Sequence, residues 1–196
     1  MADPKSVVVI AGPTGSGETT ITKEIIKRFP VRVERLVTAT TRAPRPGETN
    51  GVDYYFFTPE EFARYDAQGK ILEKTYIPNR DTYYGTYAPD LQDKIRSGKI
   101  VVVNPDIVGA RYYKEHFQAT TIFILPESID ALERRIRERN PELSDLEVAK
   151  RRENAAAEIE HEQSFYDYTV TNADGALARA VDEVVAILKK EGYTLG

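Results

Sequence analysis

Cysteine is absent from this sequence, and its only imidazole side chains belong to two histidines. Without cysteine the chain can form neither a disulfide framework nor a thiolate metal site, which suits a reducing compartment. Both histidines, His116 and His161, fall on predicted helices, and we interpret them as surface residues and not as metal ligands.

Long apolar runs are absent as well. The run Val7 to Ala11 is far too short to span a bilayer. The N-terminal residues MADPKS carry no positively charged segment before an apolar run, as a signal peptide would. The formal net charge of −4 argues against general binding to nucleic acid. We therefore expect a cytoplasmic protein that binds neither membranes nor nucleic acid.

What the sequence does contain indicates one α/β domain with insertions. The chain has 196 residues, of which 41% are hydrophobic and 30% charged, an ordinary globular composition. Apolar runs typical of strands alternate with helical patterns, which predicts a parallel sheet flanked by helices. The expected strands of this sheet are 7–10, 33–38, 100–104, 120–125 and 166–172. Residues 38–88 break the alternation with prolines, glycines and short strands, and we expect them to form an inserted domain.

A glycine-rich segment, GPTGSGET at 12–19, lies between the first predicted strand and the first predicted helix. This is the layout of a P-loop, whose backbone N–H groups hold phosphates at the start of a helix dipole. In the pattern G-x-x-x-x-G-K-[ST], Thr19 takes the position whose hydroxyl holds Mg²⁺, but Glu18 replaces the lysine. A lysine at roughly 4 Å attracts phosphate by about 4 kcal/mol, whereas a glutamate repels it. Either this repulsion weakens phosphoryl transfer severely, or Glu18 turns to solvent or to an arginine and leaves activity low.

Two groups of arginines are candidates for binding phosphate. Arg42 and Arg45 lie in a loop stiffened by proline, and a guanidinium fork matches phosphate oxygens in a bidentate way. Such a pair can equally be part of a solvated surface loop. The second group spans 134–139 and 150–152, where Arg135 and Arg139 lie one helical turn apart on one face. Charge runs of this kind are usually solvated faces of helices.

Taken together, the motifs resemble those of guanylate kinases, the family that transfers the γ-phosphate of ATP to GMP. The shared segments run in family order through nearly the whole chain: the P-loop, TTRAPRPGETNGVDYYF, the strand around Glu73, YYGT, IVVVNPDIVGAR, FILP, RRIRER, AKRR and VTN. The segment TTRAPRPGETNGVDYYF is specific to this family, whereas a P-loop alone does not identify a family. The resemblance implies a P-loop core of residues 1–37, 89–135 and 153–196, a GMP-binding domain of residues 38–88 and a helical lid of residues 136–152.

The resemblance also implies roles for individual residues. Contacts to ATP fall on Gly12, Pro13, Thr14, Gly15, Ser16, Gly17, Glu18, Thr19, Thr20 and Asn172. Contacts to GMP fall on Thr38, Arg42, Arg45, Tyr54, Glu73, Tyr84, Thr86, Asn104 and Asp106. The residues expected to act on the transferring phosphoryl group are Arg45, Arg135, Arg139 and Arg152, with Glu18 in the position of the lysine. Thr19 is the expected ligand of the Mg²⁺ that accompanies ATP.

The chemistry of guanine fits the role implied for Glu73. Guanine presents N1–H and N2–H₂ as adjacent donors, and one carboxylate accepts from both. Adenine presents an acceptor at N1 and would leave the carboxylate unpaired, at a cost of about 1–3 kcal/mol. A strand glutamate taken alone is as readily an exposed residue. Asn104 stands where the family usually has an acid, which weakens one contact to GMP or magnesium, and Pro105 indicates the end of that strand.

The sequence therefore predicts Mg²⁺-dependent phosphoryl transfer from ATP to GMP by a monomer or homodimer. The alternative is a catalytically weak or dead module of the same fold that binds GMP or a protein partner. Glu18 and Asn104 favour that alternative, whereas the guanine reader and the lid arginines oppose it. A third possibility is a related P-loop kinase for another phosphorylated small molecule, which Glu73 opposes.

Overall fold

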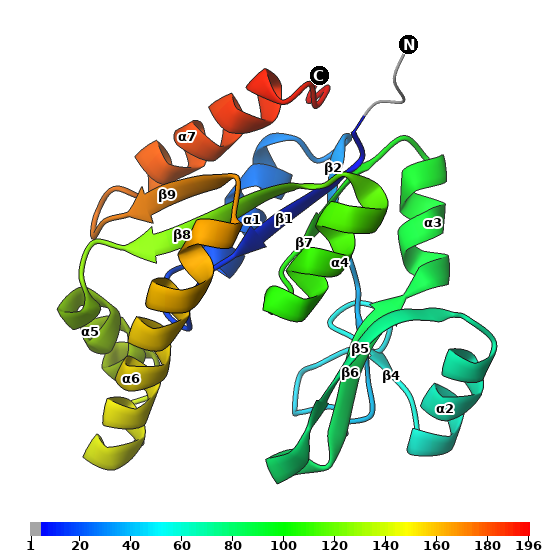
Figure 1. Ribbon diagram of the computed structural model, residues 1–196, viewed down its shortest axis with the longest axis horizontal. Coiled ribbons are helices and arrows are strands. Elements are labelled where there is room, and N and C mark those ends of the chain that lie inside the picture. Colours follow the sequence, from blue (N-terminus) through cyan, green and yellow to red (C-terminus); the bar gives the residue numbers. More distant parts are fainter. Residues whose placement is uncertain (1–4) are drawn as a thin grey trace.

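The computed structural model describes residues 5–196, without the side chain of residue 79. Its centre is a five-stranded sheet in the order β2-β7-β1-β8-β9, in which all neighbours pair in parallel (Figure 1). The strands are β1 (Val7–Ala11), β2 (Val33–Arg35), β7 (Ile100–Val103), β8 (Thr120–Pro126) and β9 (Tyr168–Asn172). The predicted parallel sheet flanked by helices is thereby confirmed.

Helices cover both faces of this sheet because its central strand is apolar on both sides. Val8 and Ile10 belong to one core cluster, and Val7 and Val9 to another, as the period of two along a strand requires. The first cluster is covered by α1 (Glu18–Arg28) and α7 (Leu177–Lys190). The second is covered by α3 (Ala88–Arg96) and α4 (Ile107–Phe117).

The inserted block forms a separate four-stranded sheet in the order β4-β3-β6-β5 (Figure 1). Its strands are β3 (Ala39–Thr40), β4 (Tyr55–Phe56), β5 (Ile71–Ile77) and β6 (Thr82–Tyr87), with a 3-10 turn at Pro78–Arg80. Helix α2 (Pro59–Ala67) packs on this sheet through Phe62, which shares a small core with Ala39 and Ile71. A capping box of Thr58 and Glu61 begins α2.

A pair of helices, α5 (Ile129–Arg139) and α6 (Asp145–Glu162), projects from the central sheet on the side where the inserted sheet also lies (Figure 1). They share a core of their own, formed by Leu132, Ile136, Val148 and Ala155. The predicted break lies between them, and Ser144 caps α6 with Glu147 in a second capping box. A 3-10 turn at Gln163–Phe165 leads from α6 to β9. Between residues 5 and 196, no helix combines the length and apolarity needed to cross a membrane.

The structure differs from the prediction mainly where the chain passes between the two sheets. The expected strand 33–38 ends at Arg35, because Val37 N–H donates to Asp90 Oδ2 and the Thr38 carbonyl accepts from Tyr55 N–H. The chain thus leaves the central sheet and enters the inserted one within three residues. The end of β7 at Val103 agrees with the position of Pro105.

Candidate active site

The P-loop follows β1 and ends at the first turn of α1. Gly17 has φ 98° and a Cβ placed on it would lie 2.3 Å from the Asn172 side-chain nitrogen, so only glycine fits there. That nitrogen donates to the Ser16 carbonyl at 2.8 Å, and Asn172 is almost completely buried. Asn172, which the resemblance implies is a contact to ATP, thus holds the P-loop to the end of β9.

Glu18 is the first residue of α1, and its carboxylate folds back onto the P-loop. Ser16 Oγ donates to Glu18 Oε2 at 3.0 Å, and Thr19 Oγ1 donates to Oε1 at 3.4 Å. A carboxylate is electrostatically favoured at a helix N-terminus. Pairing with an arginine is one of the alternatives that the sequence leaves open for Glu18, and within residues 5–196 no arginine pairs with it. The negative charge therefore lies beside the hydroxyl that we expect to bind Mg²⁺.

A cavity of about 310 Å³ lies beside the P-loop and is the candidate ATP site. Its lining combines P-loop residues, the turn after β9 and two arginines of α5, namely Gly15, Gly17, Glu18, Thr19, Thr20, Arg135, Arg139, Asn172, Ala173, Asp174, Gly175 and Leu177. Arg135 is held by Asp174, at 2.8 and 2.6 Å, and also donates to the Asn172 carbonyl at 2.8 Å. The structure thus places Arg135 and Arg139 at the cavity beside the P-loop.

Arg152 lies elsewhere, in ion pairs that join α6 to α5. Its guanidinium contacts Asp130 at 2.9 Å and Glu133 at 2.8 Å, both on α5. Its expected role on the transferring phosphoryl group therefore requires that these pairs exchange for phosphate when nucleotides bind.

The largest cavity near the P-loop, about 570 Å³, is the candidate GMP site. It lies between the inserted sheet and the core and is lined by Thr14, Thr38, Tyr54, Glu73, Thr75, Ile77, Tyr84, Gly85, Thr86, Val103, Asn104, Pro105, Asp106 and Tyr113. Seven of the nine predicted GMP contacts are among these residues. Thr86 Oγ1 donates to Glu73 Oε1 at 2.6 Å. Burial raises the pKa of Glu73; the Thr86 hydrogen bond lowers it, and the charge of Asp106 raises it further.

The two remaining predicted GMP contacts, Arg42 and Arg45, do not line this cavity, but Arg42 lies against Tyr54, which does. The Arg42 guanidinium forms a bidentate pair with Glu48, both distances 2.9 Å, and lies 5.4 Å from the Tyr54 ring centre. The Glu48 hydrogen bond raises the pKa of Arg42. The Arg45 backbone N–H donates to the same carboxylate at 2.7 Å. Glu48 therefore fixes the loop that presents both arginines, a role that sequence reasoning missed although Glu48 belongs to the quoted motif.

Asn104 and Asp106 connect the cavity to the core. The Asn104 amide donates to the Ile10 carbonyl at 2.8 Å and to Thr22 Oγ1 at 3.1 Å. Asp106 caps α4 by accepting from Gly109 N–H at 3.0 Å, and it accepts from Thr75 Oγ1 of β5 at 2.9 Å. Asp106 thus joins the inserted sheet to the core at the edge of the candidate GMP site.

The two candidate sites meet at a smaller cavity of about 240 Å³. It is lined by Glu18, Thr19, Arg35, Leu36, Thr38, Tyr54 and Asn104. Glu18 and Thr19 also line the P-loop cavity, whereas Thr38, Tyr54 and Asn104 also line the cavity of Glu73. Arg35, which sequence reasoning did not single out, lies between the two sites. The shared residues make one continuous path from the P-loop to Glu73, with Glu18 on it.

A further cavity, about 220 Å³, separates the P-loop from α6. Glu158 and Glu162 of α6 line it together with Gly12, Thr14 and Asp106, among others. Burial and the charges of Glu162 and Glu18 raise the pKa of Glu158 to about 7. This side of the P-loop is therefore acidic, and the charge of Glu158 varies near neutral pH.

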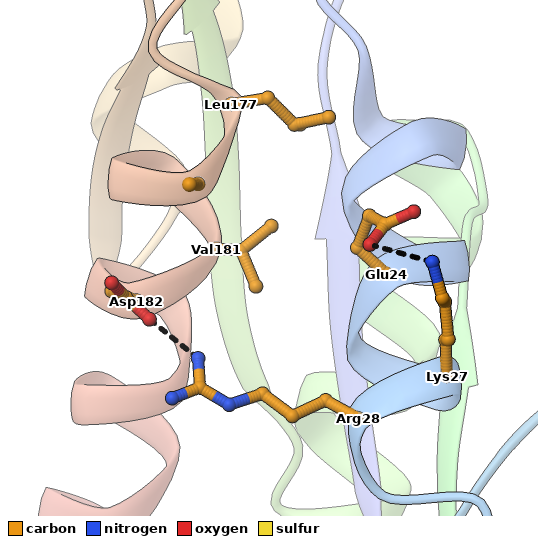
Figure 2. A pocket seen from close by; sticks show the side chains of 7 residues that line it. Glu24, Lys27, Arg28, Leu177, Val181 and Asp182 are labelled. Atoms are coloured by element: carbon orange, nitrogen blue, oxygen red, sulfur yellow. Dashed lines mark hydrogen bonds and ion pairs between the residues drawn. The ribbon is translucent and has the colours of Figure 1, made fainter.

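A groove of about 400 Å³ lies between α1 and α7 and is lined neither by the P-loop glycines nor by Glu73. Leu177 and Val181 form its apolar wall, and Arg28 and Asp182 pair across one end (Figure 2). Glu24 and Lys27 lie on the opposite rim, 4.0 Å apart. We do not assign this groove to the active site, because neither the P-loop glycines nor the residues expected to contact GMP line it.

Three features together define a class of protein. They are a P-loop at the carboxyl end of a parallel sheet, a second cavity on an inserted domain, and a pair of helices that carries arginines. That class is the P-loop nucleoside monophosphate kinases, in which a donor and an acceptor nucleotide meet at one site.

Comparisons with known proteins identify the family within this class. The guanylate kinase family matches residues 4–191 of the chain. The guanylate kinase of Rhodopirellula baltica is 37% identical over 98% of this chain and 91% of its own length, and that of Trichormus variabilis is 39% identical over 91% and 87%. The crystal structure of guanylate kinase from Anaplasma phagocytophilum superposes with a TM-score of 0.71, at 28% identity, over 97% of this chain and 89% of that chain. The chain belongs to the guanylate kinase family.

Proposed function

We propose that this chain transfers the γ-phosphate of ATP to GMP, and that Glu18 lowers the rate of this transfer. One observation carries the proposal: the Glu73 carboxylate, paired with Thr86, lies in a cavity that continues through Thr38, Tyr54 and Asn104 to the P-loop. A base held by Glu73 would place its phosphate toward Tyr54 and the P-loop. There it would face the γ-phosphate of ATP.

The arginines supply most of the positive charge that such a transfer needs. We assign the GMP phosphate to Arg42, Arg45, Tyr54 and Tyr84, and the guanine to Glu73, Thr86 and Thr38. Arg135 and Arg139 lie at the P-loop cavity, and Arg152 would join them when the lid closes. Phosphoryl transfer depends on positioning and on neutralising the equatorial oxygens, and water exclusion by a lid strengthens both.

The residues at the P-loop fit a magnesium ion that arrives with ATP. The Thr19 hydroxyl and the Glu18 carboxylate are hard oxygen donors within 3.4 Å of one another. Mg²⁺ usually binds through one or two protein oxygens plus substrate phosphates and water, not through a dedicated cage of side chains. When bound, the ion would neutralise charge on the β- and γ-phosphates. We propose Thr19 as its protein ligand, with Glu18 beside it.

We further propose that the protein acts in the cytoplasm as a monomer or homodimer, with nucleotides and not nucleic acids as its partners. The net charge of −4 and the absence of cysteine support this part of the proposal.

A coupled assay of ADP release with GMP or AMP as acceptor tests the proposed reaction. The parent protein should act on GMP and not on AMP. Glu73→Gln should weaken GMP binding by about 1–3 kcal/mol, because a neutral amide cannot accept from both guanine donors. Calorimetry measures this change, and Glu24→Gln, on the rim of the α1–α7 groove, is the control. Equal affinities for GMP and AMP in the parent protein would refute the proposal.

The second candidate function is a module that binds GMP without turnover. The position of Glu18 against Ser16 and Thr19 favours it, because the carboxylate occupies hydroxyls that a phosphate or Mg²⁺ would use. GMP binding by calorimetry, together with no ADP release in the coupled assay, would establish this alternative.

A further inference from the structure

Tyr113 of α4 reaches from the core into the candidate GMP cavity, although no motif includes it. Only 1% of this residue is exposed, and its hydroxyl is within hydrogen-bond distance of Thr86 Oγ1. Thr86 in turn donates to Glu73 Oε1 at 2.6 Å. The three side chains therefore form a chain of hydrogen bonds that crosses from the core to the inserted sheet.

The direction of this chain follows from the number of hydrogens available. The Thr86 hydroxyl has one hydrogen, which it donates to Glu73, so it accepts from Tyr113. Tyr113 can remain the donor because burial raises the pKa of its hydroxyl well above the ordinary range. Each hydrogen bond in such a chain polarises the next one, and the fixed donor prevents Thr86 from rotating away.

Packing holds Tyr113 in this position. Its ring lies 5.7 Å from that of Phe117 and belongs to the core cluster beneath β1. Gly109, one helical turn earlier on α4, also approaches Glu73: a Cβ placed on it would lie 3.6 Å from Glu73 Oε2. The same face of α4 therefore contacts Thr86 through Tyr113 and brings the backbone close to Glu73 at Gly109.

We propose that Tyr113 is a positioning residue for guanine recognition, whose buried hydroxyl directs Thr86 toward Glu73 and so fixes the carboxylate that accepts from guanine. This inference rests on the proposed function, since it assigns Tyr113 to the same acceptor site. It adds a core residue to a site otherwise built from the inserted sheet and the edges of the core. Without the tyrosine hydroxyl, Thr86 can rotate and Glu73 loses its one fixed donor.

The test is Tyr113→Phe, which keeps the ring and removes only the hydroxyl. We expect the GMP dissociation constant to rise about three- to tenfold, while those of AMP and ATP stay unchanged. The ratio of GMP to AMP affinity should decrease as the pH is lowered and Glu73 becomes protonated. In Tyr113→Phe this decrease should begin at a higher pH than in the parent protein. The reason is that burial already favours the protonated form of Glu73, and loss of a fixed donor favours it further. AMP carries the same phosphate, so this ratio isolates the base.

Tyr193→Phe is the matched control for a merely structural loss. Tyr193 is equally buried, and its hydroxyl donates to the Val7 carbonyl at 2.6 Å and accepts from Thr120 N–H at 3.1 Å. This variant should lower the melting temperature without changing the ratio of GMP to AMP affinity. If Tyr113→Phe keeps the parent ratio and pH profile, the inference is overturned and the proposed function stands. If the parent protein itself does not prefer GMP, both are overturned.

A second pair of variants applies if Tyr113→Phe is too unstable to assay. Thr86→Ser keeps the hydroxyl that accepts from Tyr113 and donates to Glu73, whereas Thr86→Val removes it. The serine variant should retain most of the GMP affinity, and the valine variant should lose about tenfold or more. Equal GMP affinities in the two variants would overturn the proposal.

Discussion

Reversing the charge at Glu18 should raise the rate of phosphoryl transfer by about two orders of magnitude. Glu18 lines both the P-loop cavity and the passage to the GMP site, so Glu18→Lys changes the charge beside the phosphates by two units. One unit at roughly 4 Å and an effective dielectric constant near 20 corresponds to about 4 kcal/mol. The side chain is only partly buried, and solvent screening reduces this to about 1–2 kcal/mol per unit. Two units give about 3 kcal/mol, which is roughly 100-fold in rate.

The structure adds a second effect of the same substitution. Ser16 Oγ and Thr19 Oγ1, which now donate to Glu18, would be released to contact phosphate and Mg²⁺. ATP affinity should therefore improve, because part of the repulsion acts before the transition state. GMP affinity should change little, since its contacts lie on the inserted sheet and at the edge of the core.

Steady-state kcat and KM for both nucleotides measure these effects. Glu24→Lys is the control, because it makes the same charge change on α1 at a residue that lines the α1–α7 groove (Figure 2). Glu24 follows Glu18 by six residues, which is roughly 9 Å along the helix axis. Salt screens most of its effect at that separation. If Glu18→Lys leaves kcat within about threefold of the parent value, the side chain does not face the phosphates and this explanation of the P-loop is wrong.

Two further predictions concern Glu158 of α6 and the movement of the lid and the inserted domain. Glu158 has a folded-state pKa of about 7 against its usual 4.5, so its contribution to stability decreases as the pH rises from 4.5 to 7. Glu158→Gln should raise the free energy of unfolding by about 1–2 kcal/mol at pH 8 and by less at pH 5, as measured by urea titration; an equal gain at both would contradict the assigned cause. The inserted domain and the lid should also close when GMP and a non-hydrolysable ATP analogue bind together, and small-angle scattering profiles that stay identical would contradict closure.

The sequence predicted well those features that depend on neighbouring residues. The P-loop and the strand around Glu73 each follow from short-range patterns, and the structure has both. The inserted domain was recognisable because prolines and glycines interrupt the alternation of strands and helices. Strand ends were less predictable: Val37 leaves the central sheet because its N–H meets Asp90, which is 53 residues away.

Features of the site that depend on distant residues were not predictable. Tyr113 lies on the apolar face of a helix, where a tyrosine is typical of a buried core, and only the fold places its hydroxyl under Thr86. Asn172 matches a family position, but its amide donates to the Ser16 carbonyl, a contact across 156 residues. Arg152 matches a family position, and the packing of α6 against α5 places it beside Asp130 and Glu133 of α5. These contacts arise from side-chain direction, which residue type and spacing do not determine.

The bond from Asn172 to Ser16 also bears on how the chain folds as it is synthesised. Strand β1 and the P-loop emerge early from the ribosome, but the amide that holds the Ser16 carbonyl is in the last strand of the sheet. Contacts over such long separations form late, because loop closure must occur first. We expect the phosphate-binding loop to remain loosely ordered until β9 joins β8, so nascent chains that stop before residue 168 should not retain nucleotide.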